Sequence, residues 1–301
     1  MRSVVQLPTS ADEFVPLLQD ESWCTSYAFK LRWPDGFICP ACGFHDQQAQ
    51  PQKRIVCRFC SRCTSITAGT LLHGSKKKLS RWFQAVWWVS CEPASLTIKN
   101  LQQRLRLNSY QTAWLWMTKL RAAMKLMEQP KCRGIVLIDA ETDDDSNLRQ
   151  PAQLLAAVES IADGWANGRL KMMFCDRLEA DVVASFCQHS VDPDSTIAAP
   201  GREPFTAVNL VDLLYTVDST KMFHEVVQKI FASFRRWCAQ KRCHSSHFRS
   251  LQDRLEEFCF LQNCALYSSK LHLFEALASA MLQHCSDRVG SQPAAADLQR
   301  G

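Results

Sequence analysis

Long apolar stretches are missing from this sequence of 301 residues. No window contains 18 consecutive apolar residues, so we expect no transmembrane helix. The first residues hold no long apolar stretch and already carry acidic side chains, so we expect no signal peptide. Without an export signal, the 15 cysteines are expected to stay reduced in the cytoplasm, where paired cysteines bind metal and isolated ones fill the core.

An even distribution of charge is missing as well. Residues 1–134 contain 19 Lys and Arg against 8 Asp and Glu, a net charge of +11, whereas residues 135–301 contain 16 and 22, a net charge of −6. A basic first part suits a polyanion, and an acidic second part suits a site built from carboxylates. A plain drift of surface charge is the alternative. The apolar content of 47% and charged content of 22% are typical of a globular protein with one large or two smaller domains.

Two closely spaced cysteine pairs, CPACG and CRFC, are separated by fourteen residues. They comprise Cys39, Cys42, Cys57 and Cys60. Two such pairs can place four thiolates around one tetrahedral Zn²⁺. The polar segment between them then predicts a zinc ribbon, a hairpin that needs its ion to fold. Cys63 and His45 are competing ligands, but we expect neither to bind because four thiolates already complete the site.

Three amphipathic segments follow, and we expect helices over 75–92, 95–107 and 108–127, the first with Ser75 as its N-cap. The turn between the last two predicts a helix-turn-helix, whose second helix normally lies in the major groove of DNA. The expected base contacts are Ser109, Tyr110, Gln111 and Thr112. The other expected DNA contacts are Lys76, Lys77, Lys78, Arg81, Lys119, Arg121 and Lys125. The alternative is an ordinary helical bundle with a core of Trp114, Leu115, Met117 and Leu120.

Three strings occur in order between about residues 14 and 127: ESWCTSYAFKLRWPDGFICPACG, CRFCSRCTSITAGTLLH and LQQRLRLNSYQTAWLWMTKLRAAM. They closely resemble the N-terminal half of bacterial insertion-sequence 1595-type transposases. The resemblance implies a zinc ribbon and a helix-turn-helix that recognise the element's ends, followed by an RNase H-like domain of the DDE type. In this family the third catalytic residue is often Asn. The family's glutamine beside the second cysteine pair is Cys63 here, which agrees with a non-ligand role.

The second half of the chain can be divided to match that domain, which has three antiparallel strands, a helix, a fourth strand and further helices. We expect strands over 134–139, 153–160, 169–176 and 195–199, and helices over 177–190, 220–241, 247–265 and about 270–284. Gly164 and Asn167-Gly168 suit a hairpin between the second and third strands.

The predicted fold class is multidomain α+β. The predicted parts are an N-terminal helix and zinc ribbon in 1–74, a helix-turn-helix domain in 75–130, an RNase H-like α/β domain with a helical C-terminus in 131–285, and a disordered tail in 286–301.

The implied chemistry requires three clustered ligands for two Mg²⁺ ions. Asp139, at the end of GIVLID and followed by Glu141, matches the first ligand. Pro200 in STIAAPGR stands where the family has its second aspartate, and Arg202 stands where it has an aromatic residue. In IFASFRRWC, the third ligand and the lysine that follows it are replaced by Ser233 and Arg235.

One carboxylate of the expected set is therefore retained. Asp192 and Asp194 should lie at the other end of the fourth strand, roughly 15–20 Å away, and Glu225 about two helical turns from Ser233. Asp176, which ends the third strand, is a possible substitute ligand that we do not favour, and residues 143–145 are expected in a solvated loop.

Three functions are compatible with these features. The first is a transposase-derived protein that binds double-stranded DNA at the element's terminal repeats without strand-transfer chemistry. The second is an active DDE-type transposase that cuts and joins DNA ends with Mg²⁺. The third is a zinc-ribbon module for protein interaction. The expected cofactor is structural Zn²⁺, with Mg²⁺ only for an active enzyme, and a homo-oligomer is the other expected partner.

Overall fold

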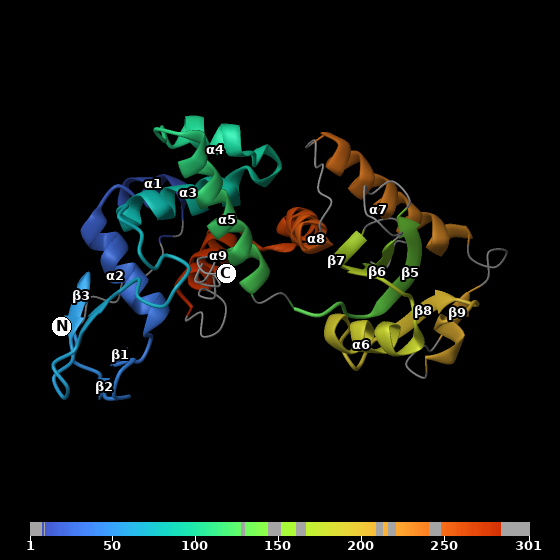
Figure 1. Ribbon diagram of the computed structural model, residues 1–301, viewed down its shortest axis with the longest axis horizontal. Coiled ribbons are helices and arrows are strands. Elements are labelled where there is room, and N and C mark those ends of the chain that lie inside the picture. The colour runs from blue at the N-terminus through green and yellow to red at the C-terminus, as the bar shows by residue number, and fades with distance from the viewer. Residues whose placement is uncertain are drawn as a thin grey trace, which may run out of the picture. The chain divides into compact units, whose positions relative to one another are not determined.

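The computed structural model describes residues 8, 10–127, 130–143, 152–160, 167–208, 213–215, 221–240 and 248–283. The chain is of mixed α/β type and divides into two compact units, one formed by residues 1–127 with 270–301 and the other by residues 128–269 (Figure 1). Gly164, residues 144–145 and the predicted tail lie outside the described residues. No described helix has the length and apolar character needed to cross a membrane.

The first unit begins with two short helices, each started by a polar side chain. They are α1 (Ala11–Leu17) and α2 (Glu21–Arg32). Ser10 accepts a hydrogen bond from the Glu13 N–H, and Asp20 accepts one from the Ser22 N–H, which satisfies backbone donors that a helix start leaves open. Two small antiparallel hairpins follow and carry the four paired cysteines. They pair β1 (Phe37–Ile38) with β2 (His45–Asp46), and β3 (Arg54–Val56) with β4 (Cys63–Ser65).

Four further helices complete the first unit: α3 (Leu79–Cys91), α4 (Ile98–Arg104), α5 (Tyr110–Leu126) and, from the far end of the chain, α9 (Lys270–Leu282). Helix α9 contacts α2, α3 and α5. Phe274 of α9 is fully buried, with its ring centroid 4.7 Å from that of Phe14 and 5.6 Å from that of Phe83. Burying large aromatic rings on one another makes α9 the centre of this core.

The unit boundaries differ from the predicted domains in two respects. The helix expected at about 270–284 was grouped with residues 131–285, whereas α9 packs in the first unit. The cysteine hairpins and α3–α5 belong to one unit and not to two. Both differences arise from packing between elements that are distant in sequence. Local hydrophobic periodicity predicts a helix but not the helices against which it packs.

The start of α3 also differs from the prediction. The helix begins at Leu79 after Lys78, and Ser75 is not its N-cap. Instead the Glu21 carboxylate, on α2, accepts hydrogen bonds from the N–H groups of Leu79 (3.1 Å) and Ser80 (3.0 Å). Ser75 accepts a hydrogen bond from the Trp82 indole N–H at 2.9 Å. A cap supplied from another helix cannot be read from the residues next to the helix start.

A five-stranded sheet forms the centre of the second unit, in the order β7-β6-β5-β8-β9. The strands are β5 (Ile135–Asp143), β6 (Ala152–Ser160), β7 (Asn167–Cys175), β8 (Thr196–Pro200) and β9 (Leu213–Tyr215). The first three strands pair antiparallel, whereas β8 lies parallel to β5, and β9 parallel to β8. Helix α6 (Ala180–Ser190) connects β7 to β8. All four strands expected from the sequence are present, together with β9, which was not predicted.

Helices cover both faces of this sheet, because alternate residues of each strand point to opposite sides. Val136 and Ile138 of β5 pack toward α6. Leu137 packs on the other side with α7 (Lys221–Gln240) and α8 (Phe248–Asn263). Residues 139 and 141 continue the alternation of Leu137, so the side chains of Asp139 and Glu141 point toward α7.

Helix α8 also closes the edge of the sheet at β7. The side-chain amide of Asn263, 2% exposed, both accepts from the Leu170 N–H (2.8 Å) and donates to the Leu170 carbonyl (2.9 Å). Gln252 accepts from the Phe174 N–H at 3.0 Å. These bonds occupy backbone groups of an edge strand that could otherwise pair with another chain.

Candidate functional sites

The four paired cysteines converge at one point. Their sulfur atoms all lie within 4.8 Å of one another, and the Cys39–Cys60 and Cys42–Cys57 pairs are each 3.7 Å apart. A tetrahedral Zn²⁺ with Zn–S bonds of about 2.3 Å requires sulfurs about 3.8 Å apart, whereas a disulfide would place them near 2 Å. The cluster can therefore hold a metal ion such as zinc.

The two cysteine pairs have the same backbone geometry. The N–H of Gly43 donates to the Cys39 carbonyl and that of Ser61 to the Cys57 carbonyl, both at 2.9 Å. Gly43 and Ser61 both have positive φ, 72° and 58°. This conformation costs a residue with a Cβ roughly 1 kcal/mol. The second turn thus reproduces the first in spite of its serine, which indicates that the four sulfurs require this shape at both turns.

Burial by itself would raise the pKa of the Cys39 thiol, but hydrogen bonds from the backbone N–H groups of Ala41 and Cys42 and from neighbouring thiols lower it to about 6. At Cys42 the Phe44 N–H lowers the thiol pKa, but burial and hydrogen bonds with the other three thiols outweigh it and raise the pKa to about 12. Binding of a metal ion requires deprotonated thiols and would therefore release protons from this cluster. Cys63 is exposed and lies outside the cluster, as expected. His45 also lies outside it, and its Nε2 is 3.1 Å from the Asp35 carbonyl oxygen.

Helices α4 and α5 are joined by a five-residue turn. Thr97 caps α4 through the Asn100 N–H, and Ser109 caps α5 through the Thr112 N–H. In the turn, Arg106 has a φ of 47°, and the N–H groups of residues 106 and 107 donate to the carbonyls of residues 103 and 102. This pair of bonds ends α4 sharply and turns the chain into α5. The two predicted helices are thus present, with ends a few residues inside those expected.

The exposure of side chains on α5 tests the alternative of an ordinary helical bundle, in which four of its residues would be buried. Met117 and Leu120 are buried, but Trp114 is 49% exposed and Leu115 is 55% exposed, so these two are not core residues. Tyr110 is 57% exposed, and Gln111 is exposed beside it. The N-terminal half of α5 therefore presents large side chains to its surroundings.

The basic residues predicted to contact DNA differ in their exposure and in their contacts within the protein. Lys76, Lys77 and Lys78 are exposed. Lys119 is partly buried, its ammonium donates to the Leu71 carbonyl, and burial lowers its pKa. Arg121 is half-buried. The Lys119 side chain is therefore directed into its own unit, which removes it from the set of contacts we expect with phosphate.

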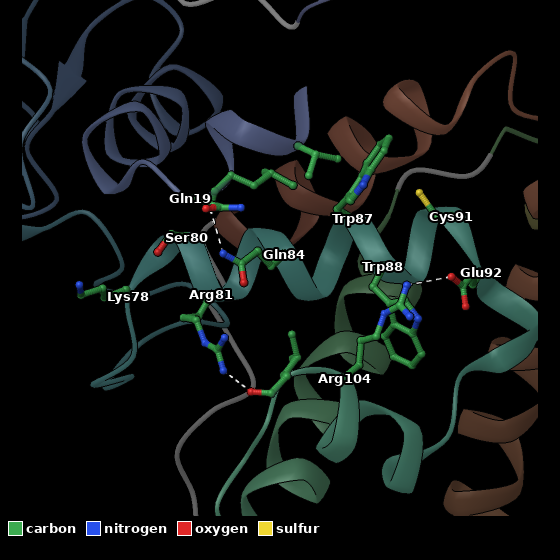
Figure 2. A pocket seen from close by; sticks show the side chains of 13 residues that line it. Gln19, Lys78, Ser80, Arg81, Gln84, Trp87, Trp88, Cys91, Glu92 and Arg104 are labelled. Carbon is green, nitrogen blue, oxygen red and sulfur yellow. Dashed lines mark hydrogen bonds and ion pairs between the residues drawn. The ribbon is translucent and has the colours of Figure 1, made fainter. Parts of the chain in front are cut away.

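Arg81 lies in an open groove of about 680 Å³ along α3. Figure 2 shows its guanidinium donating to the Leu105 carbonyl at the end of α4, and Arg104 paired with Glu92 at 3.0 Å. A cation at the C-terminal end of α4 satisfies an open carbonyl and favours the helix dipole. Arg81 and Arg104 thus hold α4 against α3, so the groove does not present two free cations.

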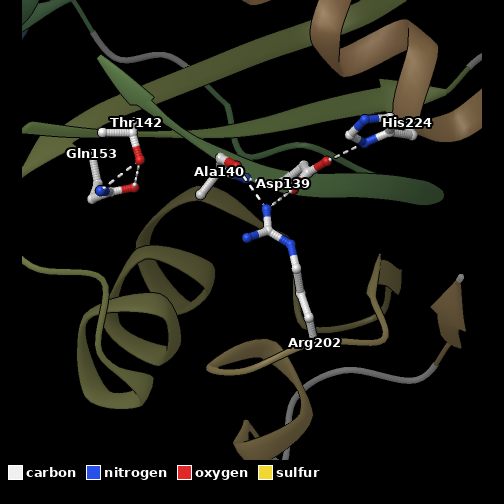
Figure 3. Close-up of polar contacts among 6 residues, drawn as sticks. All are labelled: Asp139, Ala140, Thr142, Gln153, Arg202 and His224. Carbon is white, nitrogen blue, oxygen red and sulfur yellow. Dashed lines mark hydrogen bonds and ion pairs between the residues drawn. The ribbon is translucent and has the colours of Figure 1, made fainter. Parts of the chain in front are cut away.

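Asp139 is fully buried, and each of its carboxylate oxygens has a cationic or N–H partner within the protein. Oδ1 accepts from the Arg202 guanidinium at 2.9 Å and from the Ala140 N–H at 2.7 Å, and Oδ2 lies 2.9 Å from Nδ1 of His224. Figure 3 shows Arg202 and His224 approaching the carboxylate from different elements. On the same strand face, Glu141 binds Arg235 at 2.7 Å.

The other two predicted catalytic positions have different surroundings. Leu137 of β5 lies opposite Ala198 of β8. If the same register continues for two more residues, Asp139 lies opposite Pro200, which is buried. Ser233 is exposed on α7, nine residues after His224. Nine residues rotate a helix by about 900°, which places Ser233 opposite the His224 face. Pro200 and Asp139 thus lie on neighbouring strands, whereas Ser233 lies on the side of α7 opposite His224.

No other acid in the described part of the chain completes a carboxylate site. Asp192 pairs with Arg133, Glu225 is exposed, and Asp176 is exposed after β7. Within the described residues, the four cysteines form the only group of three or more side chains placed to share a metal ion.

Comparison with protein-family models, curated proteins and solved structures finds no match to this chain. Its function is therefore inferred from its own residues. Sequence reasoning missed His224, although it lies three helical turns before Arg235 and so on the same face of the predicted helix. It also missed the role of Arg202, which it recorded only as the replacement of an aromatic residue.

Proposed function

We propose that this protein is a transposase-type double-stranded DNA-binding protein that recognises the ends of an insertion element and has lost strand-transfer chemistry. The observation that carries the DNA-binding part is the composition of the helix pair. Residues 93–127 contain six Lys and Arg and no Asp or Glu, and they fold into α4, a tight turn and α5. A compact helix-turn-helix without negative charge suits the major groove and its phosphates.

The cysteine cluster supports the same proposal as a closed structural Zn²⁺ site. Its four thiolates would fill all four positions of a tetrahedral ion and leave none for water or substrate. Zinc in this site would stabilise two hairpins whose strands are only two or three residues long and would supply no reaction chemistry.

The loss of chemistry is proposed from the surroundings of Asp139. Magnesium needs several oxygen ligands in octahedral geometry, but Arg202, His224 and the Ala140 N–H already occupy the carboxylate. Glu141 Oε2 is buried without a hydrogen-bond partner in the described part of the chain, and a single oxygen cannot replace two lost ligands. The residues present therefore do not fit the two-ion site that the resemblance implies.

The RNase H-like part of the proposal is supported by element order. Three antiparallel strands, a helix, a fourth strand and further helices are expected for that domain, and β5–β7, α6, β8 and α7–α8 follow this order. Asp139 and Pro200 then lie on adjacent strands, where two aspartates of an active enzyme would stand.

The test uses the full chain with duplexes from the DNA that flanks its coding sequence, and an unrelated duplex of equal length as control. We expect tighter binding to the flanking duplex, and a decrease of log K with log salt with a slope of about −4, as for four to five phosphate contacts. Equal and salt-insensitive binding to both would favour the protein-interaction alternative. Single-turnover incubation with Mg²⁺ or Mn²⁺ should give no nicking, and nicking that disappears in Asp139→Ala would establish an active transposase instead.

A further inference from the structure

The exposed surface at the start of α5 has an unusual composition for a DNA-reading helix. Five exposed residues lie within an arc of about 140° over the first two and a half turns. They are Tyr110, Gln111, Trp114, Leu115 and Thr118. Met117 and Trp116, between them in sequence, are buried and stabilise the helix from behind; the Trp116 ring stacks on Trp82 with centroids 3.8 Å apart. The five residues thus form one continuous surface on a fixed helix.

This surface, which we call the reading face, lacks the groups that recognise G·C pairs. Guanine is read most often by Arg or Lys, and cytosine by Asp or Glu. Residues 107–118 contain none of these four amino acids. Adenine is read by Asn or Gln, and the methyl group of thymine by apolar side chains. The reading face offers Gln111 for the first and Leu115 and Trp114 for the second.

The spacing of Gln111 and Leu115 on α5 suits contacts with two neighbouring base pairs. Gln111 and Leu115 are four residues apart, hence one helical turn and about 6 Å along α5. Ser109 caps the helix and is hydrogen-bonded to Thr112, so it is tied to the helix start and is less available to a base than Gln111. Exposed Lys99 lies on α4 and exposed Arg106 in the turn, and both complement phosphates beside the groove.

We propose that α5 selects A·T base pairs in the major groove, with Gln111 bonding to N6 and N7 of adenine and Leu115, aided by Trp114, packing on thymine methyl groups. This rests on the proposed DNA binding and adds the class of sequence recognised. The occupant of the face is duplex DNA because residues 93–127, which include α4, the turn and α5, carry six cationic side chains and no acidic one.

The experiment starts with the full chain and a duplex pool randomised at its centre. We expect the bound fraction to be enriched in A·T pairs. In the enriched duplex, replacing a contacted thymine by uracil removes only its methyl group and should weaken binding about fourfold. Replacing a contacted adenine by 7-deazaadenine removes N7 and should weaken it about fivefold or more.

Variants assign each effect to its residue. Leu115→Ala should bind the thymine and uracil duplexes equally, and Gln111→Ala should bind the adenine and 7-deazaadenine duplexes equally. Both residues are exposed, so these variants should keep the unfolding temperature of the unchanged chain. Lys99→Ala is the matched control: it should weaken binding to all these duplexes alike and leave both sensitivities intact.

Two results would overturn the inference: a selected core rich in G·C pairs, or a Leu115→Ala chain that still distinguishes thymine from uracil. A change of oligomeric state in Trp114→Ala, with base selection unaltered, would instead assign the face to a second copy of this chain and would also overturn it. Absence of binding to every duplex is a different outcome, because it contradicts the proposed function itself.

Discussion

The buried carboxylate of Asp139 shows how a charged side chain is accommodated inside the second unit. Arg202 and His224, both half-exposed, each place a nitrogen 2.9 Å from one of its oxygens. A buried charge without compensation is very costly, so the guanidinium of Arg202 and the polar imidazole of His224 offset the burial of this carboxylate. In this chain, those groups come from the end of β8 and from α7.

Asp139→Asn should lower the free energy of unfolding by about 1–3 kcal/mol, because it removes the charge that pairs with Arg202 and weakens the contact with His224, while the amide keeps the volume. The measurement is urea unfolding. Asp192→Asn is the matched control, since the Asp192–Arg133 pair lies near the surface and should contribute little to stability. Equal losses in the two variants would contradict a specific role of the Asp139 network.

Glu21 gives a prediction for pH. Burial alone would raise its pKa, but hydrogen bonds from Ser80 and Leu79 and the ion pair with Lys53 outweigh burial and lower the pKa below its usual 4.5. A carboxylate with a depressed folded-state pKa stabilises the fold above its unfolded-state pKa, and this contribution disappears as the pH falls through the folded-state value.

Glu21→Gln should therefore destabilise the first unit by about 1 kcal/mol at neutral pH, as expected for loss of a helix cap. The difference between the variant and the unchanged chain should shrink below about pH 4.5. Glu13→Gln, on the neighbouring exposed surface, serves as control. Unfolding measured over a pH series checks both, and a difference that stays constant down to low pH would refute the charged cap.

At the scale of elements, the two cysteine turns are the part that cannot fold by hydrophobic burial alone. The strands of both hairpins are very short, and Val56 and Phe59 are exposed. A hairpin of this size is marginal in water without an additional constraint.

We expect one zinc per chain, released by a strong chelator together with loss of the hairpin signals in an NMR spectrum. Cys57→Ser should abolish stoichiometric binding, whereas Cys63→Ser should leave it unchanged. Metal analysis and spectra of the two variants provide the check. A folded hairpin in Cys57→Ser without metal would show that the cluster is not a structural zinc site.

The sequence predicted elements well where the signal is local. The strands and helices of the second unit lie within a few residues of their expected ranges, because apolar periodicity and turn residues are properties of short segments. Interactions between residues far apart in the sequence were not predictable. Glu21 caps α3, and His224 is one of the partners of Asp139. The cysteine spacing predicted the four-cysteine cluster because its members lie in two short motifs. The carboxylate site has parts from three separate elements.

At the scale of the whole molecule, the two units have separate cores. Phe274 of α9 is buried in the first, and Phe258 of α8 in the second. Replacement of either by alanine should cost its own unit about 3–5 kcal/mol.

Hydrogen exchange read peptide by peptide distinguishes the units. Phe274→Ala should accelerate exchange in α2, α3 and α5, and Phe258→Ala in β6 and β7. Each variant is the control for the other, because both remove a buried ring of the same size. Uniform acceleration over the whole chain in both variants would mean that the two units unfold as one.

The position of α9 also determines when the first unit can be finished on the ribosome. Residues 128–269 are synthesised after α5 and before α9, the helix that fills the core of the first unit. Until α9 emerges, the aromatic side chains of Phe14 and Phe83 have no ring of Phe274 to cover them. A chain that stops early, or shifts frame within the second unit, releases an open apolar core that chaperones and proteases recognise. Completion of the first unit therefore depends on translation of the second.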